Sequence, residues 1–305
     1  MDKLVERINE LWYDLEENYD DAMTKGMNKQ EQEIWEKNIN LILNKMRGKI
    51  KILDLGTGTG FVPFAIRNHL DKKDMIVCSD LSQNMLDYCS KKLKDSKCKM
   101  KFIKINCANL PFAKNSFDII TCCATLHHIN NPENYLEEVK KLLKPGGFLM
   151  VGIEPNKRFF NNRFLNWQYN FFNCFKSPKV QIHKLAQHLG FEKFLQKIVL
   201  KRKKNYQIKA HKINKVLLKE KLIKKPLSIW TMRHLVERHS RKGINYKIIL
   251  PQEKTISFET YFHLNSISLD NENSKIIQKY ENLMKKIFPN DGLGFFIIKQ
   301  KREEE

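Results

Sequence analysis

The stretch KILDLGTGTGFVPFAI, residues 51–66, decides the fold. An apolar run leads into three glycines at alternate positions, Gly56, Gly58 and Gly60, and a second apolar run follows. Glycine costs conformational entropy, so it is used where the backbone takes a positive φ or approaches a neighbour closely. A strand, a glycine-rich turn and a helix in this order predict a loop whose backbone presses against a ligand.

Further apolar runs extend this pattern along the chain. We expect five buried strands, from KILDLG (51–56), MIVCSD (75–80), KFIKIN (101–106), FDIITCCATL (117–126) and FLMVGIE (148–154). Helical spacing lies between them, and strands that alternate with helices indicate a parallel sheet with right-handed crossovers. Later runs at 246–250, 255–262 and 293–300 also read as strands, from which the sheet could be completed. The predicted fold class is α/β, with a Rossmann-like, mainly parallel sheet of seven strands.

Two helix starts are marked by residue type. Ser82 precedes a helical pattern and can accept a hydrogen bond from a backbone N–H of the first turn. Asn131 is followed by Pro132, and proline is favoured at the first position of a helix. We therefore expect helices to begin directly after Ser82 and after Asn131.

The glycine spacing separates two classes of ligand. The dinucleotide fingerprint GxGxxG requires a third glycine at position 61, where this chain has Phe61. The spacing GxGxG therefore argues against a pyrophosphate and suits a ligand with a sugar and a charged amino-acid tail. Asp80, at a strand end 24 residues after Gly56, can accept both hydroxyls of a ribose. Asn106 and Cys107 end the third strand, where an amide and a backbone N–H could contact an adenine.

At this point the motifs resemble one family. ILDLGTGTGF (52–61), SDLSQNML (79–86) and INCANLPFAKNSFDIITCCATLHHINNPENYLEEVKKLLKPGGFLMV (105–151) resemble a class I S-adenosylmethionine-dependent methyltransferase. The likeness is greatest to the group that includes quinone-biosynthesis and other small-molecule methyltransferases. ELWYDLEENYDDAM (10–23) resembles the N-terminal cap of that family, in which a tyrosine such as Tyr19 closes over the cofactor.

The resemblance implies S-adenosyl-L-methionine as the cofactor and assigns its contacts. Asp54 and the Gly56–Gly60 loop would hold the methionine tail, and Asp80 the ribose. The adenine would lie against Leu81 and Met85, with Asn106, where the family more often has Asp, at its edge. The predicted cofactor-binding residues are Tyr19, Asp54, Gly56, Thr57, Gly58, Gly60, Asp80, Leu81, Met85, Asn106, Cys107 and Cys123.

His127 and His128 follow the fourth predicted strand, at the edge of the sheet where catalytic groups often lie. A histidine with a pKa near neutrality could act as a general base on an acceptor hydroxyl. Alternatively, both histidines shape the pocket. No third ligand is spaced to hold a metal with them, and the seven scattered cysteines lack paired CxxC motifs. We therefore expect neither a metal site nor a disulfide framework.

Composition constrains the partners. The net charge is +21, with 45 lysines against 10 arginines, and residues 201–225 hold eleven basic residues and one acid. That segment is a solvated face, or contacts RNA or an anionic membrane. Eight aromatic residues in 159–175 predict a packed helix or an apolar lid over a hydrophobic acceptor. With no apolar run long enough to span a membrane and no signal peptide at the N-terminus, we expect a cytoplasmic protein.

These patterns predict four parts. They are an N-terminal helical cap (1–46), an S-adenosylmethionine-binding core (47–154), a mostly helical insertion on the substrate side (155–244), and C-terminal strands that complete the core (245–305). The expected function is methyl transfer to a small-molecule or lipid-like acceptor. An RNA methyltransferase that holds RNA with its basic insertion is the second hypothesis, and a non-catalytic binding module is the third.

Overall fold

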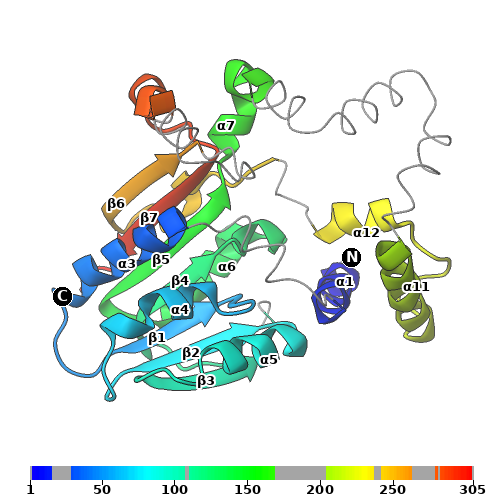
Figure 1. The fold of residues 1–305 in the computed structure, drawn as a ribbon, viewed down its shortest axis with the longest axis horizontal. Helices are drawn as coiled ribbons and strands as arrows, with labels where there is room; N and C mark the ends of the chain where they lie inside the picture. The colour runs from blue at the N-terminus through cyan, green and yellow to red at the C-terminus, as the bar shows by residue number, and fades with distance from the viewer. Residues whose placement is uncertain are drawn as a thin grey trace.

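The computed structural model describes residues 2–15, 29–106, 110–168, 204–236, 242–262, 279–280 and 282–303. One seven-stranded sheet, with the order β3-β2-β1-β4-β5-β7-β6, forms its centre (Figure 1). The first five strands pair in parallel, and β7 runs antiparallel to both β5 and β6. The predicted fold class is confirmed. The strands are β1 (Lys51–Leu55), β2 (Met75–Asp80), β3 (Lys99–Lys104), β4 (Phe117–Cys123), β5 (Leu143–Pro155), β6 (Lys254–Tyr261) and β7 (Gly294–Gln300).

Helices pack on both faces of the sheet and beside it. In chain order they are α1 (Asp2–Asp14), α3 (Lys29–Leu43), α4 (Phe61–Ile66), α5 (Gln83–Lys92), α6 (Pro132–Leu142), α7 (Lys157–Asn161), α11 (Lys204–Lys219) and α12 (Ile229–Val236). Both predicted helix starts are confirmed. The Ser82 hydroxyl accepts from the Met85 N–H, and the Asn131 side chain accepts from the Asn134 N–H, each over 3.2 Å.

The two faces of the sheet are covered by different helices. Side chains of α3, α4 and α5 form one apolar cluster with the sheet, and α6 contributes to the cluster on the other face. Trp35 of α3 is fully buried and its ring lies 4.9 Å from that of Phe296. Helix α3, which belongs to the predicted cap (residues 1–46), therefore packs on the sheet.

Helix α1 belongs to a separate helical cluster with α11 and α12, beside the carboxyl ends of the strands (Figure 1). Its apolar side chains Ile8, Leu11 and Trp12 pack among side chains of α11 and α12, such as Ile213 and Met232. The first helix of the chain and two helices from the predicted insertion thus share one core. This cluster brings α1 over the edge of the sheet where the parallel strands end.

The two ends of the predicted insertion meet at its base. Asn156 and Ile244 form a parallel β-bridge, and the Lys157 N–H donates to the Ile244 carbonyl over 3.0 Å. Gly243 has a φ of +69°, and a Cβ there would lie 2.4 Å from the Lys157 nitrogen. Glycine is required at this position because the two backbones come too close for a side chain. The chain leaves the sheet and returns to it through one closed stem.

The strand predicted at 246–250 is wrong. Residues Tyr246–Ile248 form a short 3-10 helix, started by the Asn245 side chain, which accepts from the Lys247 N–H over 3.2 Å. The run is apolar because it packs on the sheet: the Tyr246 ring lies 4.4 Å from that of Phe258. An apolar run of this length can be buried as a turn as well as a strand, and the local cap decides here.

The aromatic segment 159–175 is described only to residue 168. Phe159 and Leu165 are buried against Phe262 and Met284, whereas the Trp167 side chain is 60% exposed. Within residues 159–168, the burial of Phe159 and Leu165 agrees with the packed-helix interpretation. The rest of the segment lies outside the described residues.

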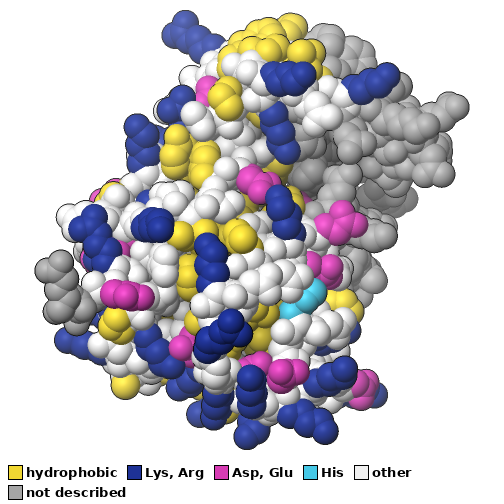
Figure 2. Space-filling model, turned by 90° about the vertical axis from the view of Figure 1, so that its left-hand side faces the viewer, with side chains coloured by type: hydrophobic (Ala, Val, Ile, Leu, Met, Phe, Trp, Pro, Cys, Tyr) yellow, Lys and Arg dark blue, Asp and Glu magenta, His cyan; other side chains and the backbone are white. Residues whose placement is uncertain are grey.

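The basic side chains form no single patch on the face of the molecule shown in Figure 2. Figure 2 shows the face that lies on the left in Figure 1, where Lys and Arg side chains are scattered between acidic and apolar ones. No helix in the described part of the chain combines the length and the apolar character that crossing a bilayer requires.

Candidate functional site

The glycine loop after β1 is shaped for close backbone approach. Gly56, Gly58 and Gly60 have φ values of +65°, +52° and +88°. A Cβ on Gly56 would lie 2.4 Å from the Thr125 Oγ1, so only glycine allows the loop to meet the end of β4. The Thr57 N–H donates to the Ser79 carbonyl over 2.9 Å, which ties the loop to β2.

Asp54 lies buried beneath this loop. Its two carboxylate oxygens accept the hydroxyls of Thr57 and Thr121, over 2.5 and 2.6 Å. Burial raises the pKa of Asp54 to about 7, although both hydroxyl hydrogen bonds lower it. A cationic ligand above the loop would favour the ionised carboxylate. Asp54 therefore both anchors the loop and places a latent negative charge under it.

Asp80, at the end of β2, faces the same loop. Its oxygens accept the Gly58 N–H over 2.8 Å and the Ser82 N–H over 2.9 Å. Burial raises the pKa of Asp80, and the hydrogen bonds from Ser82 and Gly58 oppose that rise. A carboxylate has about four lone-pair sites, so these two bonds leave capacity for ligand hydroxyls.

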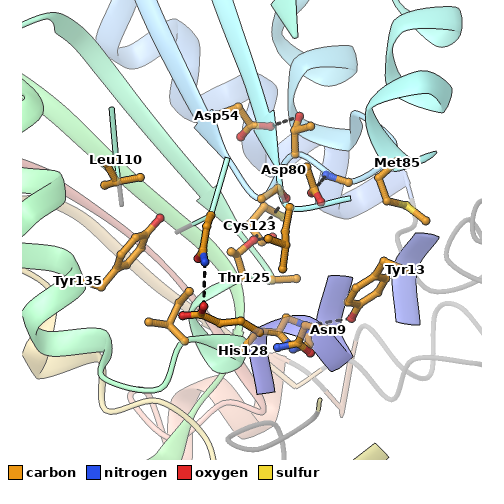
Figure 3. A pocket seen from close by; sticks show the side chains of 18 of the residues that line it. Asn9, Tyr13, Asp54, Asp80, Met85, Leu110, Cys123, Thr125, His128 and Tyr135 are labelled. Carbon is orange, nitrogen blue, oxygen red and sulfur yellow. Dashed lines mark hydrogen bonds between the residues drawn. The ribbon is translucent and has the colours of Figure 1, made fainter. Parts of the chain in front are cut away.

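These residues open onto one cavity of about 650 Å³ at the carboxyl ends of the parallel strands (Figure 3). Most of the predicted site residues line it: Asp54, Gly56, Thr57, Gly58, Asp80, Leu81, Met85, Asn106, Cys123 and His128. Gly60 starts α4 and packs against Cys89 of α5, outside the lining. Tyr19 and Cys107 lie outside the described residues. The cavity thus joins the glycine loop, the two aspartates and one of the two histidines.

Helix α1 forms the roof of the cavity through Val5, Glu6, Asn9 and Tyr13. The Asn106 amide donates to Glu6 over 2.8 Å, and the Tyr13 hydroxyl lies 3.2 Å from Nε2 of His128. None of these four was predicted as a site residue. Their spacing could have identified them, because residues four positions apart in the sequence lie on the same face of a helix.

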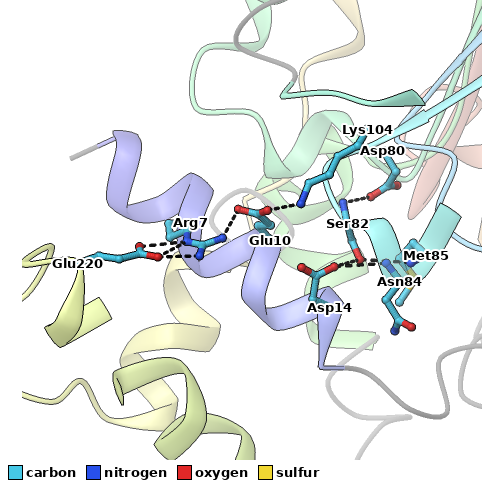
Figure 4. A network of polar contacts seen from close by, with 9 residues as sticks. All are labelled: Arg7, Glu10, Asp14, Asp80, Ser82, Asn84, Met85, Lys104 and Glu220. Carbon is cyan, nitrogen blue, oxygen red and sulfur yellow. Dashed lines mark hydrogen bonds and ion pairs between the residues drawn. The ribbon is translucent and has the colours of Figure 1, made fainter. Parts of the chain in front are cut away.

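Ion pairs hold α1 in place on two sides (Figure 4). Arg7 donates to Glu220 at the end of α11 over 2.7 Å. Glu10 accepts from Lys104 at the end of β3 over 2.5 Å, and Asp14 accepts the Ser82 hydroxyl over 2.5 Å. The roof is therefore fixed both to the insertion and to the strands that frame the cavity.

Glu154, at the end of β5, is a further residue that sequence reasoning missed. It is fully buried, and one oxygen accepts the N–H groups of Thr125 and Leu126 over 2.6 and 2.7 Å. The other oxygen accepts from the N–H of His127 and, over 2.9 Å, from Nδ1 of the same residue. Glu154 thus fixes the turn after β4 and orients His127, which does not line the cavity.

His128 joins three elements. Its Nδ1 lies 2.7 Å from the Val236 carbonyl of α12. A carbonyl only accepts, so Nδ1 carries the proton and Nε2 accepts from the Tyr13 hydroxyl. Burial, together with the neighbouring His127, lowers the pKa of His128 to about 3, whereas the hydrogen bond to Val236 opposes the shift. His128 is therefore neutral at neutral pH, with Nε2 engaged by Tyr13 of the roof and Nδ1 by Val236 of α12.

Comparison with known proteins places the first two thirds of the chain, including the five parallel strands, in one family. Residues 1–202 match the ubiE/COQ5 methyltransferase family. The chain belongs to this family. The methyltransferase is 31% identical over 178 residues to a ubiquinone/menaquinone biosynthesis C-methyltransferase of Wigglesworthia glossinidia brevipalpis. The aligned residues cover 57% of this chain and 68% of that one.

Two further proteins are similar to parts of the chain. A demethylmenaquinone methyltransferase of Lactococcus lactis subsp. lactis is 29% identical to the methyltransferase over 206 residues, 66% of this chain and 73% of that one. A solved S-adenosylmethionine-dependent methyltransferase from Aquifex aeolicus is 25% identical, with a TM-score of 0.34, over 39% of this chain and 64% of that one. The expected enzyme class and cofactor are confirmed: the protein is a class I S-adenosylmethionine-dependent methyltransferase.

The residues of the cavity fit this cofactor. The backbone at Gly56 leaves a space that a Cβ would fill. Asp54 places a carboxylate beneath the loop, where a cationic tail would lie. Asp80 keeps lone pairs for ribose hydroxyls, which are the donors that S-adenosylmethionine presents. Among the described residues, no three His, Cys, Asp or Glu side chains gather as a metal ion would need.

The depressed pKa of His128 predicts a pH effect on the stability of the methyltransferase. Below its ordinary pKa of about 6.5, this histidine takes up a proton in the unfolded chain but not in the folded one, until the pH nears 3. Because the unfolded chain then binds one proton more than the folded one, the free energy of unfolding falls by about 1.4 kcal/mol for each pH unit by which the pH is lowered. We expect His128→Gln to remove this slope in urea unfolding between about pH 6.5 and pH 5.

The exposed His211 provides the control for this experiment. His211→Gln should leave the slope as in the wild type, since this change lies on the exposed face of α11 and leaves His128 in place. Equal slopes in the wild type and in His128→Gln would show that His128 is protonated in the folded chain.

Proposed function

We propose that this methyltransferase transfers a methyl group to a ring carbon of a quinone-like acceptor that carries an apolar tail. The names of its relatives support this class: one is a ubiquinone/menaquinone biosynthesis C-methyltransferase and the other a demethylmenaquinone methyltransferase. The observation that carries the proposal is the shape of the cavity, which extends beyond the glycine loop into an apolar region. That region is lined by Leu110, Phe112, Ile129, Tyr135 and Leu142.

When bound, S-adenosylmethionine would supply an electrophilic methyl group and would leave as S-adenosylhomocysteine. The chain's own residues align the partners and exclude water. Asp54 and the glycine loop hold the charged tail, Asp80 holds the ribose, and α1 closes the cavity. We assign a pocket-shaping role to His128, because its ring nitrogens are engaged by Tyr13 and Val236.

The basic segment 201–225 is proposed to bring the enzyme to an anionic membrane surface that holds such an acceptor. In its described part, Lys212, Lys215, Lys224 and Lys225 are exposed on and after α11. Lysines near an anionic bilayer contribute roughly 1 kcal/mol each to binding. RNA as the substrate receives no support from the named relatives, which act on quinones by their names.

One labelling experiment tests this proposal. The full chain, with S-adenosylmethionine labelled in its methyl group, is incubated with reduced demethylmenaquinone in anionic vesicles and, separately, with cellular RNA. We expect label in the organic-soluble fraction. Changing the four exposed lysines to glutamine should reduce that label at limiting vesicle concentration but not with a short-tailed acceptor in solution.

Two results would contradict the proposal. Label in RNA that falls steeply with salt would favour phosphate contacts and the RNA hypothesis. If the quinone remains unlabelled while S-adenosylhomocysteine still binds, the enzyme acts on a different acceptor.

A further inference from the structure

Two helical segments of the methyltransferase, 163–168 and 282–287, carry large apolar side chains on their outer side. Four of these residues are each at least half exposed, and we call them the apolar surface: Phe164, Trp167, Leu283 and Ile287. Single exposed apolar side chains are ordinary, but a contiguous group of them marks contact with a protein or a membrane.

Contacts between the two segments make the apolar surface continuous. The ring of Phe164 lies 6.0 Å from that of Phe288, and the Tyr280 hydroxyl donates to the Gln168 side chain over 3.1 Å. Both segments also contribute to the same buried cluster beneath the surface. In Figure 2 hydrophobic side chains gather at the top of the molecule, where Figure 1 draws α7 and the orange-red segment 282–287.

The apolar surface lies at the edge of the sheet that bears the cavity. The first segment follows α7, which comes directly after β5, and the second precedes β7. Gly294 at the start of β7 pairs with Pro155 at the end of β5. Both segments therefore lie beside the carboxyl end of β5, the edge at which the parallel strands open onto the cavity.

The residues around the apolar surface are mostly basic. Residues 157–168, 279–280 and 282–291 contain six basic side chains and one acidic side chain. The acid among them, Asp291, accepts from Arg158 over 2.6 Å. The other five basic residues are exposed: Lys157, Arg163, Lys279, Lys285 and Lys286. A partner of this surface must therefore be apolar at its centre and anionic around it.

We propose that the apolar surface inserts into the interface of an anionic bilayer, with these basic side chains at the level of the lipid headgroups. Tryptophan is enriched at this depth, and lysine can lay its stem along apolar surface while its charge reaches a phosphate. A protein partner fits less well, because lysine is depleted at protein interfaces. The contact goes beyond the one proposed for segment 201–225, because it requires apolar insertion as well as charge.

Vesicle binding of the full chain, without cofactor or acceptor, tests this proposal. The vesicles contain phosphatidylcholine and phosphatidylglycerol in equal parts. We expect the double variant Leu283→Gln/Ile287→Gln to bind about tenfold or more weakly than the wild type, since two half-exposed side chains no longer favour transfer into the bilayer. Vesicles of phosphatidylcholine alone should bind the wild type more weakly, because they carry no charge for the lysines to meet.

The double variant Leu41→Gln/Tyr88→Gln provides the matched control. It changes two exposed apolar side chains of α3 and α5, away from the apolar surface. This variant should bind vesicles as the wild type does. Both double variants should melt close to the wild type, since changes at exposed positions have small effects on stability.

The fluorescence of Trp167 reports insertion directly. Lipids brominated in their chains should quench part of the wild-type fluorescence, because the Trp167 ring would lie where headgroups meet hydrocarbon. Trp167→Phe should still bind the vesicles but lose this quenching. Quenching that persists in Trp167→Phe would overturn the proposal, since a different part of the chain would then meet the bilayer.

Two further results would overturn the proposal. If the wild type does not bind the anionic vesicles, the apolar surface is left for a protein partner. If Leu283→Gln/Ile287→Gln binds them as tightly as the wild type, the contact depends on charge alone.

This design separates the membrane contact from the proposed function. If Trp167 enters the bilayer but no quinone is labelled, the proposed function fails and the apolar surface keeps its role. If quinone is labelled while vesicle binding is unchanged in Leu283→Gln/Ile287→Gln, the role of the surface fails and the proposed function stands.

Discussion

Replacing Glu154 with alanine is expected to lower the free energy of unfolding by about 3–5 kcal/mol, the cost of breaking a buried charge network. The carboxylate is fully buried and accepts from three backbone N–H groups and from the His127 ring. Alanine would leave all of these donors without a partner in the interior. Urea unfolding measures the loss.

The turn after β4 should lose its shape along with this stability. Because Thr125 and His128 of that turn line the cavity, S-adenosylhomocysteine binding should weaken in Glu154→Ala. Glu259→Ala is the control, since Glu259 is 37% exposed and pairs with one lysine, so its loss should cost under about 1 kcal/mol. A loss of stability in Glu154→Ala no larger than in this control would show that water or a shifted backbone replaces the carboxylate.

The second large effect concerns the cofactor. Asp80→Ala is expected to weaken the binding of S-adenosylhomocysteine by about 1.5–3 kcal/mol, the range for hydrogen bonds to a charged group. This corresponds to roughly 10- to 150-fold in Kd. Two bonds from Gly58 and Ser82 hold the carboxylate in place, so its remaining lone pairs are presented to the ligand without reorientation. Titration calorimetry measures the affinity directly.

Asp87→Ala is the matched control, because Asp87 is exposed on α5 and accepts from Gln83 of the same helix. It should leave the affinity unchanged. The wild type should bind no NAD, which has the pyrophosphate that Phe61 argues against. An Asp80→Ala variant that binds S-adenosylhomocysteine as the wild type does would reduce Asp80 to a support for the glycine loop.

Local residue types were sufficient to predict the centre of this fold. The loop of Gly56, Gly58 and Gly60, the cap at Ser82 and the five parallel strands all depend on interactions within a few residues or within one strand. Asp54 and Asp80 were predicted for the same reason, since the carboxyl ends of neighbouring parallel strands meet at one edge.

The roof of the cavity could not be predicted in this way. Tyr13 contacts His128, which follows it by 115 positions in the sequence. Arg7, on the same helix, binds Glu220, which follows it by 213 positions. Nothing in either segment specifies the other, because such pairs depend on how the insertion folds back. Glu154 was missed because its partners are backbone N–H groups of a turn about 28 residues earlier, which have no signature of their own. Gly243 and Asn245 likewise acquire their meaning only in the folded chain.

The long separation between α1 and its partners has a consequence for synthesis. A ribosome adds about 5–20 residues per second, so Glu220 emerges roughly 10–40 s after Arg7, which lies 213 positions earlier. During that interval Ile8, Leu11 and Trp12 of the nascent chain have no α11 or α12 to cover them. The five parallel strands precede α11 and α12 in the chain and can pair before them, whereas the apolar face of α1 is covered only after both helices have been made. Chaperone demand during translation should therefore include α1, whose apolar side chains wait for packing partners from a distant segment of the chain.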